Sequence, residues 1–295
     1  LFVIFLAYFV YTQDLNQIIE YKIFDRDYVP KVYLQGDTYF PVLKNGQIET
    51  PNFTADSVLI YEARKGKILY SYNSDLKHAQ ASTAKLMTAI VARELYDPND
   101  YIKATKNCYE VPGTKIWLPV GEKFKVKDIL YAMLVGSAND AACLLANSKV
   151  PQSVFVDQMN AKAEEYGLVD THFNNPIGFD SLSGDNYSTA QDLYKLSKVA
   201  LADNFISEVV KTPVYLIQAV DSEYYTNVYS TNTLLWQIPG TVGVKTGTTQ
   251  NAGEVLIYKY EDSIKSLVII VMGSQDRFSD TRNLLSWVAN NYRWD

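Results

Sequence analysis

The sequence contains few of the residues that most often bind metal ions. It has two histidines, His78 and His172, and two cysteines, Cys108 and Cys143, and no pair of them has the spacing of metal ligands. This scarcity argues against a zinc hydrolase and predicts that the protein needs no metal or organic cofactor. We expect both histidines to be structural. The cysteines could form a disulfide, but Cys143 lies in an apolar helical run, so we expect a buried free thiol.

Positive charge is also scarce. The net charge at pH 7 is −6, which gives no reason to expect binding to nucleic acid. Internal repeats and low-complexity tracts are absent. The composition, 47% hydrophobic and 20% charged, is typical of a globular protein. A length of 295 residues allows one large domain or two moderate ones.

Only one long apolar run is present, at residues 1–11. It is too short to span a bilayer, but it fits the end of a signal sequence or of an anchor helix. No clear cleavage site follows it, so we expect a retained membrane anchor first, a cleaved signal second and a buried strand third. Residues 12–50 are polar and predict a linker. We therefore expect an anchor or signal remnant plus linker at residues 1–49 and a folded domain at residues 50–295.

Strand patterns lie near both ends of this domain, with helical patterns between them. Strands are predicted at residues 57–61, 67–72, 241–248, 254–260 and 264–272, and a further hairpin at 211–230. The clearest helical patterns lie at residues 127–134, 152–166, 190–202 and 280–292. Ser188 and Gln191 form a predicted capping box. This order predicts a mixed α/β (α+β) fold, with an antiparallel sheet of about five strands from both chain ends, flanking helices and an inserted, mainly helical subdomain.

A candidate nucleophile and base lie in the segment Ala79–Thr88. Ser82 and Lys85 are three residues apart, so they share one face of the predicted helix. The amine of Lys85 would lie over the hydroxyl of Ser82 and could take its proton, provided that burial or a second cation lowers the pKa of the lysine. By itself, such a pair is more often a helix cap beside a solvated lysine. Its meaning therefore depends on the rest of the chain.

Two further clusters bear on that question. The first, Ser137-Ala-Asn139, lies in a predicted turn between two apolar helices. The second, Lys245-Thr-Gly-Thr248, lies on a predicted strand. It is not a phosphate loop, because Val244 replaces the required glycine and no helical pattern follows. A lysine and a threonine on a strand suit the binding of a carboxylate, and Gly247 would let an extended peptide approach the strand closely.

Together, the three clusters resemble the signature of the penicillin-recognising serine enzymes. The closer resemblance is to the low-molecular-weight D-alanyl-D-alanine carboxypeptidases of the S11 peptidase family, whose second motif is Ser-Gly/Ala-Asn. Further agreement is found at Asn139–Ala142, Asn175–Gly178, Tyr187–Ala190, Lys245–Thr249, Ala252–Gly253 and Arg277. The resemblance covers roughly residues 51–292 and implies a β-lactamase/transpeptidase-like fold.

The resemblance implies a role for each catalytic residue. Ser82 would attack the carbonyl between the two terminal D-alanines of a peptidoglycan stem peptide, and Lys85 would accept its proton. Lys245 would lie nearby and keep the amine of Lys85 neutral. Ser137 would relay a proton to the leaving amine. The oxyanion would lie between the backbone N–H groups of Ser82 and Thr248.

The resemblance also implies how the substrate is held. Asn139 would bind the peptide amide, and the strand around Gly247 would pair with the peptide. Thr246 and Arg277 would bind the free terminal carboxylate. The implied activity is that of a serine D,D-carboxypeptidase that removes the terminal D-alanine from stem pentapeptides through an acyl-serine intermediate. β-Lactams would inhibit it covalently. We expect an extracytoplasmic protein of the cell envelope, tethered to the membrane by its N-terminal segment or secreted.

Three alternatives stay open. A D,D-endopeptidase that cuts peptide cross-links would carry the same motifs. A class A-like β-lactamase would need a carboxylate to activate water, and the segment 174–186 contains Asp180 and Asp185 but no glutamate. A non-catalytic cell-wall-binding protein would keep the fold, but the intact motifs argue against it. Because the sequence ends just after the predicted closing helix, we expect no C-terminal β-rich domain.

Overall fold

The computed structural model describes residues 39–44, 49–180 and 186–295. The predicted anchor at residues 1–11 lies outside these ranges. Within the described part of the chain, no helix combines the length and the apolar character needed to cross a bilayer.

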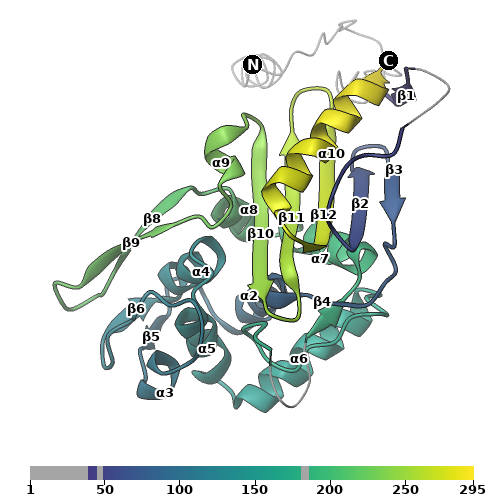
Figure 1. Ribbon diagram of the computed structural model, residues 1–295. Helices are drawn as coiled ribbons and strands as arrows, with labels where there is room; N and C mark the ends of the chain where they lie inside the picture. The colour runs from purple at the N-terminus through teal and green to yellow at the C-terminus, as the bar shows by residue number, and fades with distance from the viewer. Residues whose placement is uncertain (1–38, 45–48, 181–185) are drawn as a thin grey trace, which may run out of the picture.

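A five-stranded antiparallel sheet forms the centre of the molecule (Figure 1). Its strands follow the order β10-β11-β12-β2-β3. Their bounds are Ser57–Glu62 for β2, Lys67–Tyr72 for β3, Thr241–Thr249 for β10, Gly253–Glu261 for β11 and Ser266–Ser274 for β12. Strand β12 pairs with β2, so that Ile270 lies opposite Leu59. The prediction of an antiparallel sheet built from both ends of the chain is confirmed.

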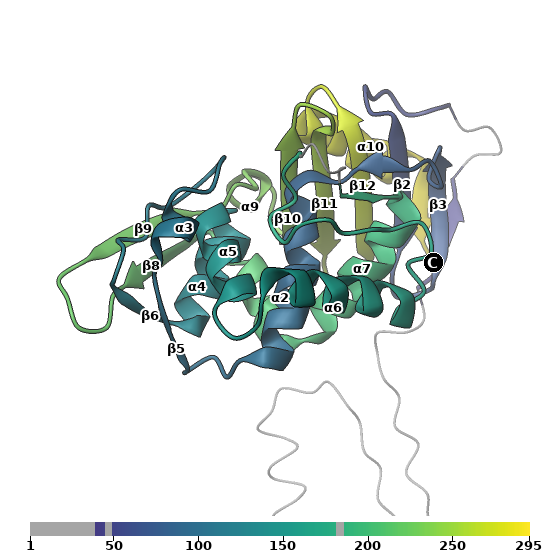
Figure 2. The same ribbon diagram turned by 90° about the horizontal axis from the view of Figure 1, so that it is seen from below.

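Strands β2 and β12 are buried on both faces of the sheet, since nearly all of their side chains are buried and successive side chains point in opposite directions. Figure 2 shows α7 (Ala190–Ala202) on one side of the sheet and α10 (Arg277–Asn291) on the other. On β12, Ile269 belongs to the hydrophobic layer that contains Leu284 of α10. The next residue, Ile270, belongs to the opposite layer with Leu196 of α7. Each fully buried side chain of this size contributes about 1.5–3 kcal/mol, so the two layers fix the sheet between the helices.

The predicted helical subdomain is inserted between β3 and β10. Helix α2 (Lys85–Leu95) runs through it and buries every residue from Lys85 to Ala92. The other helices are the 3-10 turn η1 at Ala81–Ala84, α3 at Lys106–Tyr109, α4 at Val126–Val135, α5 at Asn139–Asn147, α6 at Gln152–Glu165, α8 at Asn204–Val210 and α9 at Leu234–Gln237. Short antiparallel pairs join β4 (His78–Ala79) to β7 (Tyr187–Ser188), β5 (Tyr101–Lys103) to β6 (Lys123–Lys125), and β8 (Val214–Gln218) to β9 (Tyr225–Tyr229).

Helix α7 is capped one residue later than predicted. Its N-cap is Thr189, whose side chain accepts a hydrogen bond from Asp192 N at 3.1 Å. Ser188 belongs to strand β7, where it pairs with His78. Gln191 donates its backbone N–H to Ser74 O. The predicted capping box of Ser188 and Gln191 is therefore wrong, because a tertiary strand pair occupies the first of its two residues.

The two ends of the described chain meet. Strand β1 (Pro41–Leu43) pairs with the last strand, β13 (Tyr292–Trp294). Trp287 Nε1 also donates to Glu49 O at 2.6 Å. Part of the segment predicted as a linker is thus hydrogen-bonded to the end of the domain. The domain boundary between residues 49 and 50 stays a prediction.

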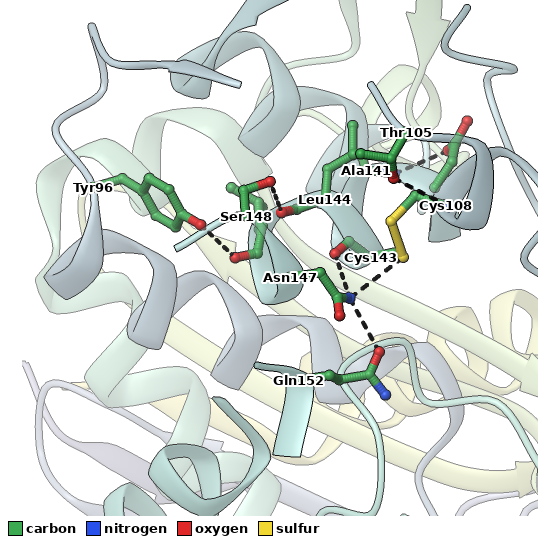
Figure 3. The surroundings of a disulfide bond; sticks show 11 residues. Tyr96, Thr105, Cys108, Ala141, Cys143, Leu144, Asn147, Ser148 and Gln152 are labelled. Atoms are coloured by element: carbon green, nitrogen blue, oxygen red, sulfur yellow. Dashed lines mark hydrogen bonds between the residues drawn. A yellow bond between two sulfur atoms is a disulfide. The ribbon is translucent and has the colours of Figure 1, made fainter. Parts of the chain in front are cut away.

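Cys108 and Cys143 form a disulfide, so the predicted free thiol is wrong (Figure 3). Cys143 lies in the apolar helix α5, as expected, but its side chain faces α3, which carries Cys108. The Cα atoms are 5.4 Å apart, within the range that a disulfide spans. Sequence periodicity places Cys143 on a buried helix face, whereas only tertiary packing shows what that face meets.

Loss of this disulfide should destabilise the domain. It joins residues 35 positions apart, and cross-links of this kind contribute about 2–4 kcal/mol, chiefly by restricting the unfolded chain. Urea unfolding of the oxidised protein and of the C108A/C143A variant measures the difference. Equal free energies of unfolding, or two reactive thiols in the native wild-type protein, would contradict the assignment.

Candidate active site

Ser82 and Lys85 meet as predicted. Ser82 lies in the turn η1, and Lys85 begins helix α2. Lys85 Nζ lies 2.7 Å from Ser82 Oγ, and it donates a hydrogen bond to Ile177 O at 2.6 Å. Ser82 is not a helix cap, because the N-cap of η1 is Gln80 and no side chain caps the turn. Lys85 is 0% exposed, which excludes the alternative of a solvated lysine.

The surroundings of Lys85 favour a neutral amine. Burial lowers the pKa of Lys85 well below 10.5, and the positive charge of Lys245 lowers it further. Asp140 raises the pKa, but its effect is smaller than either of these. A neutral amine can accept the proton of Ser82, whereas an ammonium group cannot. Burial is therefore the main reason why this lysine can act as a base.

A second lysine–serine pair completes the site. Lys245 Nζ, on strand β10, donates to Ser137 Oγ at 2.8 Å and to Thr246 O at 2.9 Å. Lys245 is 1% exposed. Burial, and then the charge of Arg277, lower the pKa of Lys245 to about 7. This lysine can therefore gain or lose a proton near neutral pH, and Ser137 is within reach of that proton.

Two residues beside the reacting groups have backbone conformations that residues with a Cβ rarely adopt. The φ angle is 48° at Ala81, which precedes Ser82, and 57° at Ser137. Such conformations cost on the order of 1–3 kcal/mol each and persist only where the surrounding structure enforces them. At Ser137, the turn between α4 and α5 directs the hydroxyl toward Lys245.

The turn at residues 175–179 supports the pair of Ser82 and Lys85 through its backbone. Asn175 Oδ1 accepts hydrogen bonds from the backbone of Ile177, Gly178 and Phe179, which fixes the carbonyl of Ile177 against Lys85. Gly178 has a φ of 73°, and a Cβ there would lie 2.0 Å from Ala81 O. Sequence reasoning assigned these residues no role. The Asn-Pro-x-Gly turn could have indicated this role, because a glycine in a turn often marks a place where two backbone segments approach closely.

Strand β10 runs past Ser82. A Cβ on Gly247 would lie 3.0 Å from Ser82 N, so a larger residue would push the strand and the turn η1 apart. The strand lies at the edge of the sheet, with β11 as its one partner in the sheet order. An edge strand can accept an extended peptide as an additional partner.

The two threonines of the third motif have different neighbours. Thr246 is buried, and its hydroxyl lies within hydrogen-bond distance of that of Thr231. Thr248 is exposed, and its hydroxyl accepts a hydrogen bond from Arg277 Nη1. The same nitrogen donates to Gly247 O at 2.8 Å. The structure therefore brings the side chain of Thr248 to Arg277, a contact that sequence reasoning missed because it considered only the backbone of Thr248.

Asn139 begins helix α5 and is tied to the loop before helix α4. Its backbone N–H donates to Thr114 O at 2.7 Å, and its Nδ2 donates to Pro112 O at 2.7 Å. Its Oδ1 is buried and has no hydrogen-bond partner in the described part of the chain. Asn139 thus has an unpaired buried acceptor two residues after Ser137.

Other titratable groups have structural partners. Asp180 Oδ2 accepts a hydrogen bond from Asn251 N at 3.0 Å, whereas Asp185 lies outside the described residues. His78 Nε2 lies 3.3 Å from Asp56 Oδ2, and His172 pairs through its backbone with Tyr187. Across the described ranges, no group of three or more His, Cys, Asp or Glu side chains could hold a metal ion. The contacts of Ser82 with Lys85 and of Ser137 with Lys245 suit acyl transfer through a serine nucleophile with a lysine base.

Comparison with known proteins gives related sequences over most of the chain. The family model of the D-alanyl-D-alanine carboxypeptidases, peptidase S11, matches residues 44–276. The D-alanyl-D-alanine carboxypeptidase DacF of Bacillus subtilis is 30% identical over 248 residues, and the match spans 81% of this chain and 63% of the length of that relative. A D-alanyl-D-alanine endopeptidase of Pseudomonas aeruginosa is 31% identical over 258 residues, which are 84% of this chain and 81% of that protein.

A solved structure shares the fold. Penicillin-binding protein D2 of Listeria monocytogenes, in its ampicillin-bound form, matches with a TM-score of 0.72 and 27% identity. The match covers 82% of this chain and 99% of that chain. The predicted fold is confirmed.

Replacement of Gly178 by alanine should destabilise the protein more than the same change at Gly167. Both glycines have positive φ angles, 73° and 66°, so both variants incur the cost of about 1 kcal/mol for an L-residue in this region. Only at Gly178 would the new Cβ also meet Ala81 O, since nothing lies within 4 Å at Gly167. Urea unfolding should show an additional loss of about 1–3 kcal/mol for Gly178→Ala. Equal losses would mean that the contact with Ala81 does not constrain the fold.

Proposed function

The chain belongs to the D-alanyl-D-alanine carboxypeptidase family, peptidase S11, and on this premise we propose that it is a serine D,D-carboxypeptidase. It removes the terminal D-alanine from peptidoglycan stem pentapeptides through an acyl-serine intermediate. The observation that carries the proposal is the pair of buried contacts, Lys85 with Ser82 at 2.7 Å and Lys245 with Ser137 at 2.8 Å. The names of the carboxypeptidase relatives support the same activity, whereas other relatives are named endopeptidases.

Acylation begins at Ser82. The neutral amine of Lys85 accepts the hydroxyl proton while Oγ forms a bond to the carbonyl carbon between the two D-alanines. The carbonyl electron pair moves onto oxygen and returns as the C–N bond breaks. Ser137 gives a proton to the leaving amine and regains one from Lys245. In net terms, Lys85 gains one proton and Lys245 loses one, and D-alanine leaves. Water then attacks the ester carbonyl; its oxygen stays on the released peptide as the new carboxyl group, and Ser82 Oγ regains a proton. The proton that Lys85 took during acylation passes back to Lys245, which restores both lysines.

The developing oxyanion lies between two backbone N–H groups, those of Ser82 and Thr248. Donors of this kind contribute about 10²–10³ in rate each, because they are oriented before the charge develops. Gly247 supports this assignment, since its lack of a side chain lets strand β10 approach the backbone of Ser82.

The rest of the substrate is held from both sides. The unpaired Oδ1 of Asn139 accepts a hydrogen bond from the peptide amide on the acyl side of the scissile bond. The terminal carboxylate binds to the guanidinium of Arg277 and to the hydroxyl of Thr248, which are already in contact. A direct role for Thr246 in binding the carboxylate stays a prediction, because its hydroxyl already faces Thr231. Recognition of a free carboxylate favours cleavage at the end of a peptide.

We place the protein outside the cytoplasm, in the cell envelope, where peptidoglycan lies. The disulfide between Cys108 and Cys143 supports this, because disulfides persist in oxidising compartments. Tethering through residues 1–11 stays a prediction. β-Lactams should acylate Ser82 by the same route as the peptide.

Incubation with a fluorescent penicillin tests the nucleophile. The intact mass of the wild-type protein should increase by one penicillin, and the Ser82→Ala variant should show no adduct. The same variant should lose D-alanine release from a pentapeptide by at least about 10³-fold. An unchanged adduct on Ser82→Ala would exclude this serine as the nucleophile.

The endopeptidase alternative needs its own test, because relatives named carboxypeptidase and relatives named endopeptidase both match the chain. A pentapeptide and a cross-linked peptide dimer are compared as substrates at equal concentration. Our proposal predicts a higher kcat/KM for release of D-alanine from the pentapeptide. A higher value for the dimer would assign the protein as an endopeptidase.

Removal of the Lys245 charge should shift the pH dependence of acylation. Because this charge lowers the pKa of Lys85, the variant Lys245→Gln should raise that pKa. Acylation needs neutral Lys85, so the rate falls as the pH drops through its pKa, and in the variant this fall should occur at higher pH. Lys259→Gln, which removes a charge from strand β11, is the matched control. If the acylation rate of Lys245→Gln falls at the same pH as in the wild type, or at a lower pH, the role of Lys245 is contradicted.

A further inference from the structure

An exposed tryptophan close to the site has a strained backbone. Trp117 has a φ of 61°, in the left-handed region, although it is a bulky residue. It is 56% exposed, so burial of its ring does not compensate for the strain. An outlier of this kind near a site points to function rather than to stability.

The strained conformation is enforced by a buried carboxylate. Asp140 is 0% exposed and follows Asn139 directly. Its Oδ1 accepts a hydrogen bond from Ile116 N at 3.4 Å, and its Oδ2 accepts one from Leu118 N at 3.1 Å. The side chain of Leu118 is buried and anchors the loop. The residues on either side of Trp117 are therefore fixed to helix α5, and the tryptophan side chain is left exposed.

This loop lies beside the residue that we assign to the peptide amide. The carbonyl groups of Pro112 and Thr114 accept hydrogen bonds from the side chain and backbone of Asn139. A Cβ on Gly113 would lie 2.6 Å from Asn139 Nδ2, so the loop and the amide are in close contact. Because Asn139 serves the acyl side of the scissile bond, the loop lies next to the substrate residue that precedes the two D-alanines.

Lys115 adds a positive charge to this loop. Its Nζ lies 4.0 Å from the centroid of the Trp117 ring and donates to Tyr109 O at 3.0 Å. In the part of the chain that the structure describes, no carboxylate pairs with Lys115. The nearby Glu110 already pairs with Lys106, at 3.8 Å. A cation without a carboxylate partner beside the site, in a chain of net charge −6, favours an acidic ligand.

We propose that Lys115 and Trp117 form a specificity subsite for the substrate residue that precedes the two D-alanines, and that they select a side chain with a free carboxylate. The ammonium group of Lys115 pairs with that carboxylate, and the ring of Trp117 packs against the aliphatic part of the same side chain. The inference rests on the proposed function, because that function orients the peptide along Asn139.

Two acylated tripeptides ending in D-Ala-D-Ala test the subsite. They differ only in the first residue, whose side chain ends in a carboxylate in one peptide and in the corresponding amide in the other. The wild-type protein should show a kcat/KM for D-alanine release about fivefold higher for the carboxylate peptide, as expected for a partly exposed ion pair.

Three lysine variants test whether Lys115 causes the preference for the carboxylate peptide. Lys115→Met keeps the aliphatic chain and should abolish the preference, whereas Lys115→Arg keeps the charge and should retain it. Lys103→Met removes an exposed lysine from strand β5 of the same subdomain and should retain it too. Loss of the preference in Lys103→Met, or its retention in Lys115→Met, would overturn the role of Lys115.

Trp117→Gly separates binding from folding. Glycine adopts a φ of 61° without strain, so the Tm of this variant should be unchanged or higher. Its KM should rise about fivefold for both peptides while kcat is retained, because the lost contact lies away from the reacting bond. A lower Tm with an unchanged KM would show that Trp117 is structural and would overturn the subsite.

Penicillin acylation, followed by intact mass, separates this inference from the proposed function. A wild-type protein that is acylated and releases D-alanine equally from both peptides overturns the subsite alone. A wild-type protein that is not acylated and releases no D-alanine overturns the proposed function itself.

Discussion

The chemistry of this site depends on two lysines that are buried within reach of each other's charge. A charged amine is costly in an apolar interior, and a second one nearby increases the cost, so the fold favours the neutral form. Lys85 lies on the central helix of the helical subdomain, and Lys245 lies on the edge strand of the sheet. Burial has the larger effect on the pKa of Lys85, and the sheet adds the charge of Lys245 to that effect.

The helical subdomain and the sheet can meet at these lysines because backbone segments approach each other closely at two glycines. Gly178 brings one loop against Ala81, and Gly247 brings strand β10 against the backbone N–H of Ser82. The strained residues Ala81 and Ser137 then orient the two hydroxyl groups. The surrounding structure thus offsets local strain at the points where the reacting atoms must be held, which is a common arrangement in enzymes.

The sequence predicted the features that depend on local spacing. The contact of Ser82 with Lys85 follows from a separation of three residues, and the hairpins follow from alternation and turn residues. Features that depend on tertiary packing were not predictable in this way. The partner of Cys143 lies on another helix, and the side chain that meets Arg277 is that of Thr248 because of how α10 docks on the sheet.

The pKa of Lys85 tests most directly whether this lysine can act as the base for Ser82. It can be followed by ¹³C NMR of the lysine Cε signals in protein with labelled lysine, with Lys85 assigned by its absence in Lys85→Arg. We predict that the amine of Lys85 titrates well below 10.5. A Lys85 signal that stays protonated up to about pH 10, the range of a solvated lysine, would contradict a lysine base at Ser82.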